Sequence, residues 1–261
     1  MKIKVKVNNV GHGLCISLIH ENGKVMLWDC GHNEDCRPSV FLPRSGISEI
    51  GIFFVTNYDE DHISDLPELR RKRRKLSIST LYRNPSISKE QLRLLKRQSG
   101  PISPAMQSML DMLDMYNTPG KPPEFPGVTY SCYYNNYETD FVDSNNISLV
   151  TFLTCNGYKF IIPGDLEKPG WEKLLNDTNF CRELQDVKTF IASHHGRENG
   201  YCEKVFEHCC PDVVVFSDAS IKHETQKMSE IYARHARGIQ FGGRTRHVLS
   251  TRQDGALEWP L

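Results

Sequence analysis

The sequence lacks long hydrophobic runs, paired cysteine motifs and an excess of either charge. None of its apolar stretches approaches the roughly 20 residues that a transmembrane helix requires. The strand-like beginning, MKIKVKVNNV, has no apolar core of a signal peptide, so we expect a cytoplasmic protein that does not enter a membrane. Lysine plus arginine and aspartate plus glutamate each number 32. The net charge is therefore zero, which argues neither for nor against a nucleic-acid partner.

The nine cysteines form no Cys-x-x-Cys pair, the spacing typical of structural zinc sites. In a reducing compartment we expect them to be free thiols, several of them buried. The adjacent Cys209 and Cys210 make a weak zinc candidate, since no second pair follows at a zinc-finger spacing.

Apolar runs separated by turns and helical patterns predict a mixed α/β chain. Asn-Gly turns at 22–23 and 156–157 each join two apolar runs and indicate β-hairpins. The very apolar run at 51–55 predicts a strand buried on both faces. Each half of the chain has a hairpin followed by strands and helices, which predicts an α/β sandwich of two sheets flanked by helices. Helices are predicted after the N-caps Ser88 and Ser103 and at 167–176, 201–209 and 224–236, with a loop at 118–127.

Residue types that bind metals gather where four apolar strands are predicted to end. In a layered α/β fold such ends share one edge, where loops build sites. Carboxylates crowded together resist ionisation unless a cation compensates them, and a mixed Asp and His set suits zinc, manganese or iron better than calcium. Alternatively, the acidic residues only cap the helix that follows them. The residues are Asp29, Asp59, Asp61, His62, Asp165, His194 and His195.

These four elements, in this order, resemble the metallo-β-lactamase fold superfamily. The matching stretches are VGHGLCISLI…VMLWDCG, VTNYDEDHISDL, NNISLVTFLTCNGYKFIIPGDLE and IASHHG. They are most similar to the metallo-hydrolase domain of ComEC-type DNA-uptake competence proteins, whose pattern reads VGQGD…LIDTG, SHxDxDHIGGL, NNxSLVL…LLTGD and HHGS. The resemblance implies an αββα sandwich of two mixed sheets that forms a single domain over residues 1–261. A basic helical insertion at about 70–125 lies outside the resemblance.

The resemblance also implies a site for one or two divalent ions, zinc or manganese. Asp61, His62 and Asp165 would hold the ion of the second site together with either His195, which we favour, or His194. Asp165 would bridge the two ions, and Asp59 would belong to the first site. This chain has Asn57 where the family has its first histidine, so the first site should be weak, empty or selective for a harder ion such as manganese or magnesium. Three further residues are candidates either for the first site or for hydrogen bonds that orient the metal ligands. They are Asn57, Asn146 and Asp29.

For an enzyme of this kind, the resemblance implies metal-assisted hydrolysis of a phosphodiester, with DNA as the favoured substrate. Asp61 would orient or deprotonate the attacking water, and His223 would contact the leaving group or a phosphate. His12 and His32, beside glycine turns, are further candidates. Six consecutive basic residues add an independent hint of nucleic-acid binding, although such a run also suits a solvated helix face. They are Arg70, Arg71, Lys72, Arg73, Arg74 and Lys75.

Two other functions stay open. Asn57 and the incomplete first site would suit a degenerate metallo-hydrolase that binds or regulates beside a protein partner, for instance in a bacterial defence system. A small-molecule hydrolase such as a lactonase is the third alternative, because a fold does not fix its substrate.

Overall fold

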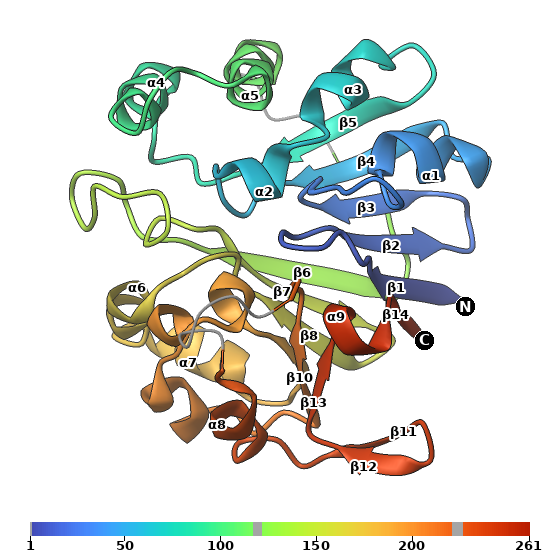
Figure 1. Ribbon diagram of the computed structural model, residues 1–261, viewed down its shortest axis with the longest axis vertical. Helices are drawn as coiled ribbons and strands as arrows, with labels where there is room; N and C mark the ends of the chain where they lie inside the picture. Colours follow the sequence, from blue (N-terminus) through green and yellow to red (C-terminus); the bar gives the residue numbers. More distant parts are fainter. Residues whose placement is uncertain (1, 117–121, 221–226) are drawn as a thin grey trace.

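Two six-stranded mixed sheets face each other in the computed structural model, which describes residues 2–116, 122–220 and 227–261 (Figure 1). The strand order is β14-β1-β2-β3-β4-β5 in the first sheet and β13-β10-β9-β8-β7-β6 in the second. Helices cover the outer side of each sheet (Figure 1). The predicted αββα sandwich is therefore confirmed.

The strands alternate along the chain with short helices. The first sheet contains β1 (Ile3–Val7), β2 (Ile16–His20), β3 (Val25–Trp28), β4 (Glu49–Phe54), β5 (Ser77–Tyr82) and β14 (Leu257–Pro260). The second contains β6 (Val128–Tyr133), β7 (Val150–Cys155), β8 (Tyr158–Ile162), β9 (Val187–Ile191), β10 (Val213–Phe216) and β13 (Val248–Ser250). A separate ribbon pairs β11 (Ile239–Phe241) with β12 (Arg244–Arg246).

The helices fall into two groups. Those of the first half are α1 (Pro38–Arg44), α2 (Glu60–Ile63), α3 (Leu66–Arg71), α4 (Lys89–Arg97) and α5 (Pro104–Met115). Those of the second half are α6 (Lys168–Leu174), α7 (Thr178–Leu184), α8 (Ser229–Ala233) and α9 (Thr251–Asp254), with 3₁₀ turns η1 (Ser193–Gly196), η2 (Glu198–Gly200) and η3 (Glu203–Glu207). No helix in the described ranges has the length and apolar character needed to cross a bilayer.

Local signals predicted the turns and caps correctly. The β2–β3 and β7–β8 hairpins turn at the expected Asn-Gly pairs, and Asn156 and Gly157 both take positive φ, as a type I′ turn requires. Ser88 caps α4 in a reciprocal capping box with Gln91, and the Ser103 hydroxyl accepts from the N–H of Met106 in α5.

Other elements differ from the prediction because they are too short to show a helical period or are set by distant contacts. Segment 201–209 forms the 3₁₀ turn η3 instead of an α-helix. Helix α8 begins at Ser229, and the predicted helix residues 224–226 lie outside the described residues. Residues 122–127 form no helix or strand, as expected, while 118–121 are not described. The region 70–125 also contains β5, an edge strand that pairs parallel to β4.

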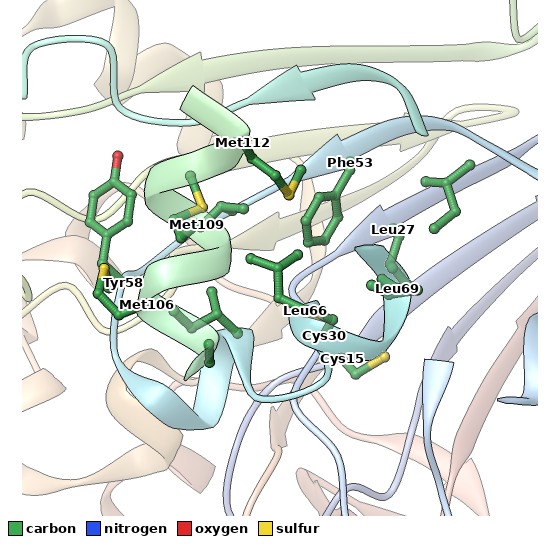
Figure 2. Close-up of a cluster of buried hydrophobic side chains, with 14 of the residues drawn as sticks. Cys15, Leu27, Cys30, Phe53, Tyr58, Leu66, Leu69, Met106, Met109 and Met112 are labelled. Atoms are coloured by element: carbon green, nitrogen blue, oxygen red, sulfur yellow. The ribbon is translucent and has the colours of Figure 1, made fainter. Parts of the chain in front are cut away.

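Three apolar layers hold the sandwich together. The layer between the sheets includes Trp28 stacked on Phe54, with ring centroids 4.7 Å apart. A second layer lies between the first sheet and its helices, where Met109 and Met112 of α5 face Phe53 (Figure 2). The third layer packs α6, α7 and α8 on the second sheet around Trp171 and related aromatic residues. Strands β3 and β4 of one sheet and β8, β9 and β10 of the other run parallel to their neighbours, so their carboxyl ends can supply residues to one site.

Candidate metal centre

Four side chains from three chain segments meet between the carboxyl ends of the sheets. Asp61 and His62 lie in α2, just after β4; Asp165 follows β8; His195 follows β9 in η1. Their ligand atoms all lie within 4.8 Å of one another. His62, Asp165 and His195 are buried, whereas Asp61 is partly exposed at the rim. Sequence reasoning named all four residues.

The polar atoms at the centre of this cluster have no hydrogen-bond partner among the residues that the structure describes. His62 Nε2 lies 3.0 Å from Asp165 Oδ1, and His195 Nε2 lies 3.2 Å from Asp61 Oδ2. His62 Nε2, His195 Nε2 and Asp165 Oδ1 are nevertheless buried without a hydrogen bond. Buried polar atoms are rarely left in this way, and two imidazoles with two carboxylates are a donor set for a divalent transition metal. The residues present therefore fit a metal ion.

The opposite nitrogens of both histidines are held by groups behind the cluster. His62 Nδ1 lies 2.7 Å from Asp29 Oδ2, and the Asp29 carboxylate also accepts from the N–H of Thr56 at 2.7 Å. His195 Nδ1 donates to the carbonyl of Ser217 at 2.9 Å. Such contacts fix the tautomer that leaves Nε2 free for a metal. Asp29, a candidate for either role, thus orients His62.

The charges in the cluster depend on one another. Burial by itself would lower the pKa of His62, but the carboxylates of Asp165 and Asp29 raise it well above its ordinary value. Burial would likewise raise the pKa of Asp165, but His62 and His195 hold it well below its usual range. Without a metal, the imidazoles therefore bind protons to compensate the carboxylates.

The backbone is strained where it delivers these side chains. His194 and His195 have φ values of 49° and 56°, and Asp29 has 55°, in the left-handed region that residues other than glycine rarely adopt. Gly196 follows with φ 77°, and a Cβ there would lie 2.5 Å from the Phe216 ring. Strained conformations of this kind cluster at functional sites.

His194 lies beside the cluster rather than in it. Its Nε2 is 3.8 Å from Asp165 Oδ2, and its Nδ1 is 3.5 Å from Glu167 Oε1. Burial lowers the pKa of His194, which keeps its ring neutral at pH 7. The structure therefore places His195 among the four clustered side chains and His194 against the outer edge of Asp165.

The residues expected at the first metal site are engaged elsewhere. The Asp59 carboxylate pairs with Lys96 Nζ and accepts from Ser144 Oγ at 3.0 Å. The Asn57 amide bonds to neighbouring protein groups through both its nitrogen and its oxygen. The Asn146 amide oxygen accepts from the N–H of Gly170 at 2.8 Å. Asp59 does not join the four-residue cluster.

Two further residues lie at the rim: His12, a candidate from the sequence, and Arg197, to which the sequence analysis gave no role. His12 Nε2 lies 3.3 Å from Asp61 Oδ2, and Arg197 Nη2 lies 3.3 Å from His12 Nε2. Burial, with the nearby His195, lowers the pKa of His12 to about 4, so its ring is neutral at pH 7. The only signal for Arg197 in the sequence was its place after the His-His-Gly motif, where the family pattern has serine.

The remaining candidates lie elsewhere. His32 contacts Ser64 Oγ at 2.8 Å and is outside the cluster, and His223 lies outside the described residues. The basic run 70–75 leads into Ser77, which pairs with Glu49 at the beginning of β4, whereas the metal cluster follows the end of β4. At a rise of about 3.4 Å per residue, this register places the end of the run roughly 17 Å from the end of β4 along the strand. Arg70 and Arg71 are already paired with acidic side chains.

Comparison with known proteins agrees with the geometry. No protein-family model matches the chain. ComE operon protein 3 of Bacillus subtilis (strain 168) is 22% identical over 226 residues, which cover 84% of this chain and 26% of that protein. This chain thus spans about a quarter of the relative's length.

Similar solved structures include the metallo-β-lactamase fold protein YhfI from Bacillus subtilis, with 12% identity, 99% of each chain covered and a TM-score of 0.52. A diphosphatase from the PhnP family has 12% identity, a TM-score of 0.52 and coverage of 100% of this chain and 98% of its own. CmlA, a diiron β-hydroxylase from Streptomyces venezuelae, has 13% identity, a TM-score of 0.56 and coverage of 99% and 54%. The chain therefore has the metallo-β-lactamase fold.

The contact between Asp29 and His62 predicts a loss of metal affinity when the carboxylate is removed. We expect Asp29→Asn to weaken zinc binding by about 10- to 100-fold, because His62 loses the partner that orients it. Competition with a chromophoric chelator would measure this. Asp65→Asn is a matched control, since Asp65 is also a buried carboxylate but accepts from Ser39. Equal affinities of Asp29→Asn and the wild type would contradict the assignment.

The raised pKa values of His62 and His195 predict that metal binding releases protons. The protonated imidazoles compete with the metal, so affinity should rise with pH across the neutral range and fall as the pH drops. Calorimetric titration with zinc in buffers of different ionisation enthalpy would report the protons released. Binding without any proton release at pH 7 would show that these rings are neutral before the metal arrives.

Proposed function

We propose that this chain is a metal-dependent hydrolase that cleaves phosphodiester bonds, with DNA as the favoured substrate. The observation that carries the proposal is the cluster of Asp61, His62, Asp165 and His195, whose central atoms are buried without hydrogen bonds. The diphosphatase among the similar structures supports chemistry at phosphorus, and the resemblance to competence proteins supports DNA.

Asp61 is the member of the cluster that a substrate can reach. A divalent cation bound at such a site would lower the pKa of a bound water to near neutral. The cation would also polarise the phosphoryl oxygen that is attacked. The Asp61 side chain is 26% exposed, against 3% or less for the other three. Burial would raise the pKa of Asp61, but the neighbouring His195 and His62 hold it below its usual range. Asp61 is thus ionised at neutral pH and can orient the water or accept its proton.

Arg197 and His12 form the cationic and polar side of the rim. The Arg197 guanidinium lies next to His12, which itself contacts Asp61. Guanidinium groups suit phosphate oxygens because they offer several donors in a fixed fork. We assign Arg197 the binding of the phosphoryl group, with His12 as a neutral hydrogen-bonding neighbour. This is the role once expected of His223, which the structure does not describe.

A binding or regulatory module that works with a protein partner is the second candidate. It is favoured by one observation: the first metal site of the family is replaced by contacts of Asn57 and Asp59 with protein groups. Such a module would need no metal. A bound metal stabilises the folded chain by mass action, so unchanged melting in a chelator, with no metal found in the purified protein, would support the module.

The role proposed for Asp61 predicts that its replacement will abolish most of the hydrolysis. With zinc, manganese or magnesium, the wild type should cleave DNA and the small diester bis(p-nitrophenyl) phosphate. Asp61→Ala should lower the rate at least about 10²-fold, the range expected for loss of an acid–base group. Glu60→Ala is the control, because the Glu60 carboxylate contacts Ser103 outside the cluster. A metal-loaded wild type inert on DNA, RNA, cyclic nucleotides and the small diester would refute the proposal.

Because the end of the basic run lies away from the four-residue cluster, we expect the run to contribute to DNA binding but not to hydrolysis. Replacing Arg73, Arg74 and Lys75 with alanine should weaken DNA binding and flatten its dependence on salt, yet leave cleavage of the small diester unchanged. Arg197→Ala should instead lower kcat/KM by about 10- to 100-fold on both substrates, as expected for a lost charge-assisted hydrogen bond. Unaltered DNA binding by the triple variant would exclude the run as a nucleic-acid surface.

A further inference from the structure

We infer that Lys96 takes the place of the first metal ion, so that the chain binds a single ion at Asp61, His62, Asp165 and His195. This inference rests on the proposed metal-dependent function and specifies its stoichiometry.

Asn57 cannot act as a ligand while it keeps its present contacts. Its side chain is fully buried. Its amide oxygen accepts from the N–H of Asp59 at 2.7 Å, and its amide nitrogen lies 3.1 Å from both Asn145 Oδ1 and Ser148 Oγ. A metal would have to take the oxygen away from the Asp59 N–H, which would then be left without that partner. The amide instead ties the loop after β4 to the loop before β7.

Asp59 already has its counter-charge. The Lys96 ammonium contacts Asp59 Oδ1, and Ser144 Oγ donates to the same oxygen at 3.0 Å. The Lys96 side chain is 16% exposed and the Asp59 side chain 36%, so the ion pair is partly shielded from water. A divalent ion at Asp59 would lie close to the ammonium and repel it, and the two cations would compete for one carboxylate.

Helix α4 holds Lys96 in place. The helix begins at the Ser88 capping box, and Leu92 and Leu95 on its inner face are buried in the core of the first half. This helix belongs to the region 70–125 that falls outside the family resemblance. The same segment that distinguishes this chain from the family therefore supplies the cation, while the substitution at Asn57 removes the imidazole.

Metal analysis of four proteins tests the inference. After dialysis against zinc, and separately against manganese, elemental analysis should give one equivalent for the wild type and still one for Asn57→His, because Lys96 remains. Asn57→His combined with Lys96→Gln should gain a second equivalent. The control Lys89→Gln removes a lysine from the same helix, which pairs with Asp114 at 2.5 Å, and should leave one equivalent.

The outcomes separate this inference from the proposed function. Two equivalents in the wild type or in Asn57→His would overturn the inference and leave the metal-dependent hydrolase intact. A wild type that binds no metal would overturn both. A folded double variant that still holds one equivalent would show that Lys96 is not what excludes the first ion.

Thermal unfolding in a chelator gives a test that requires no metal and no activity. Lys96→Gln and Asp59→Asn should each lower the melting temperature, since each leaves one partner of the ion pair without the other. Their combination should lower it by clearly less than the sum of the two single effects, because the partners are coupled. Fully additive shifts would show that the ion pair contributes nothing to the folded chain and would overturn the inference.

Discussion

Compensation of buried negative charge is the constraint on which this site depends. Asp29 and Asp165 lie almost completely out of water, and an isolated carboxylate there would be prohibitively costly. His62 lies between them, with one ring nitrogen 2.7 Å from Asp29 and the other 3.0 Å from Asp165. The protonated imidazole can compensate both carboxylates, or it can lose its Nε2 proton to solvent and offer that nitrogen to a metal. The line Asp29–His62–Asp165 thus joins two buried carboxylates through one ring that is able to bind either a proton or a metal.

The same constraint accounts for the unusual backbone around the cluster. The chain approaches Asp61 so closely that a Cβ on Gly13 or Gly31 would lie 2.4 or 2.3 Å from the Asp61 carbonyl oxygen. His195 reaches its place only with a positive φ, and the energy of that conformation is offset by the bond from its Nδ1 to Ser217. Close backbone packing at Asp61 and the hydrogen bond to Ser217 thus help to hold the ligands in a preorganised arrangement.

Local signals predicted the hairpins, the helix caps and the strand-end clusters, because each depends on neighbouring residues. They could not distinguish His194 from His195, since the direction of each side chain follows from two consecutive positive φ values. The role of Lys96 could not be predicted from the sequence for a different reason. Lys96 lies 37 positions from Asp59 in the chain, and only the packing of α4 brings the two side chains into contact. The register of β5 on β4 likewise decides where the basic run lies, and no pattern within the run reveals that register.

Lysine and a metal ion solve the same electrostatic problem in chemically different ways. Both place positive charge beside a carboxylate, but an ammonium only donates hydrogen bonds, whereas a divalent ion also accepts ligands and activates water. A site with one of each therefore separates two tasks. The Asp59–Lys96 side can hold the loop after β4 in position whether or not metal is available. Under the proposed function, the cluster of Asp61, His62, Asp165 and His195 would carry the chemistry, because its central atoms are buried with no hydrogen-bond partner among the described residues.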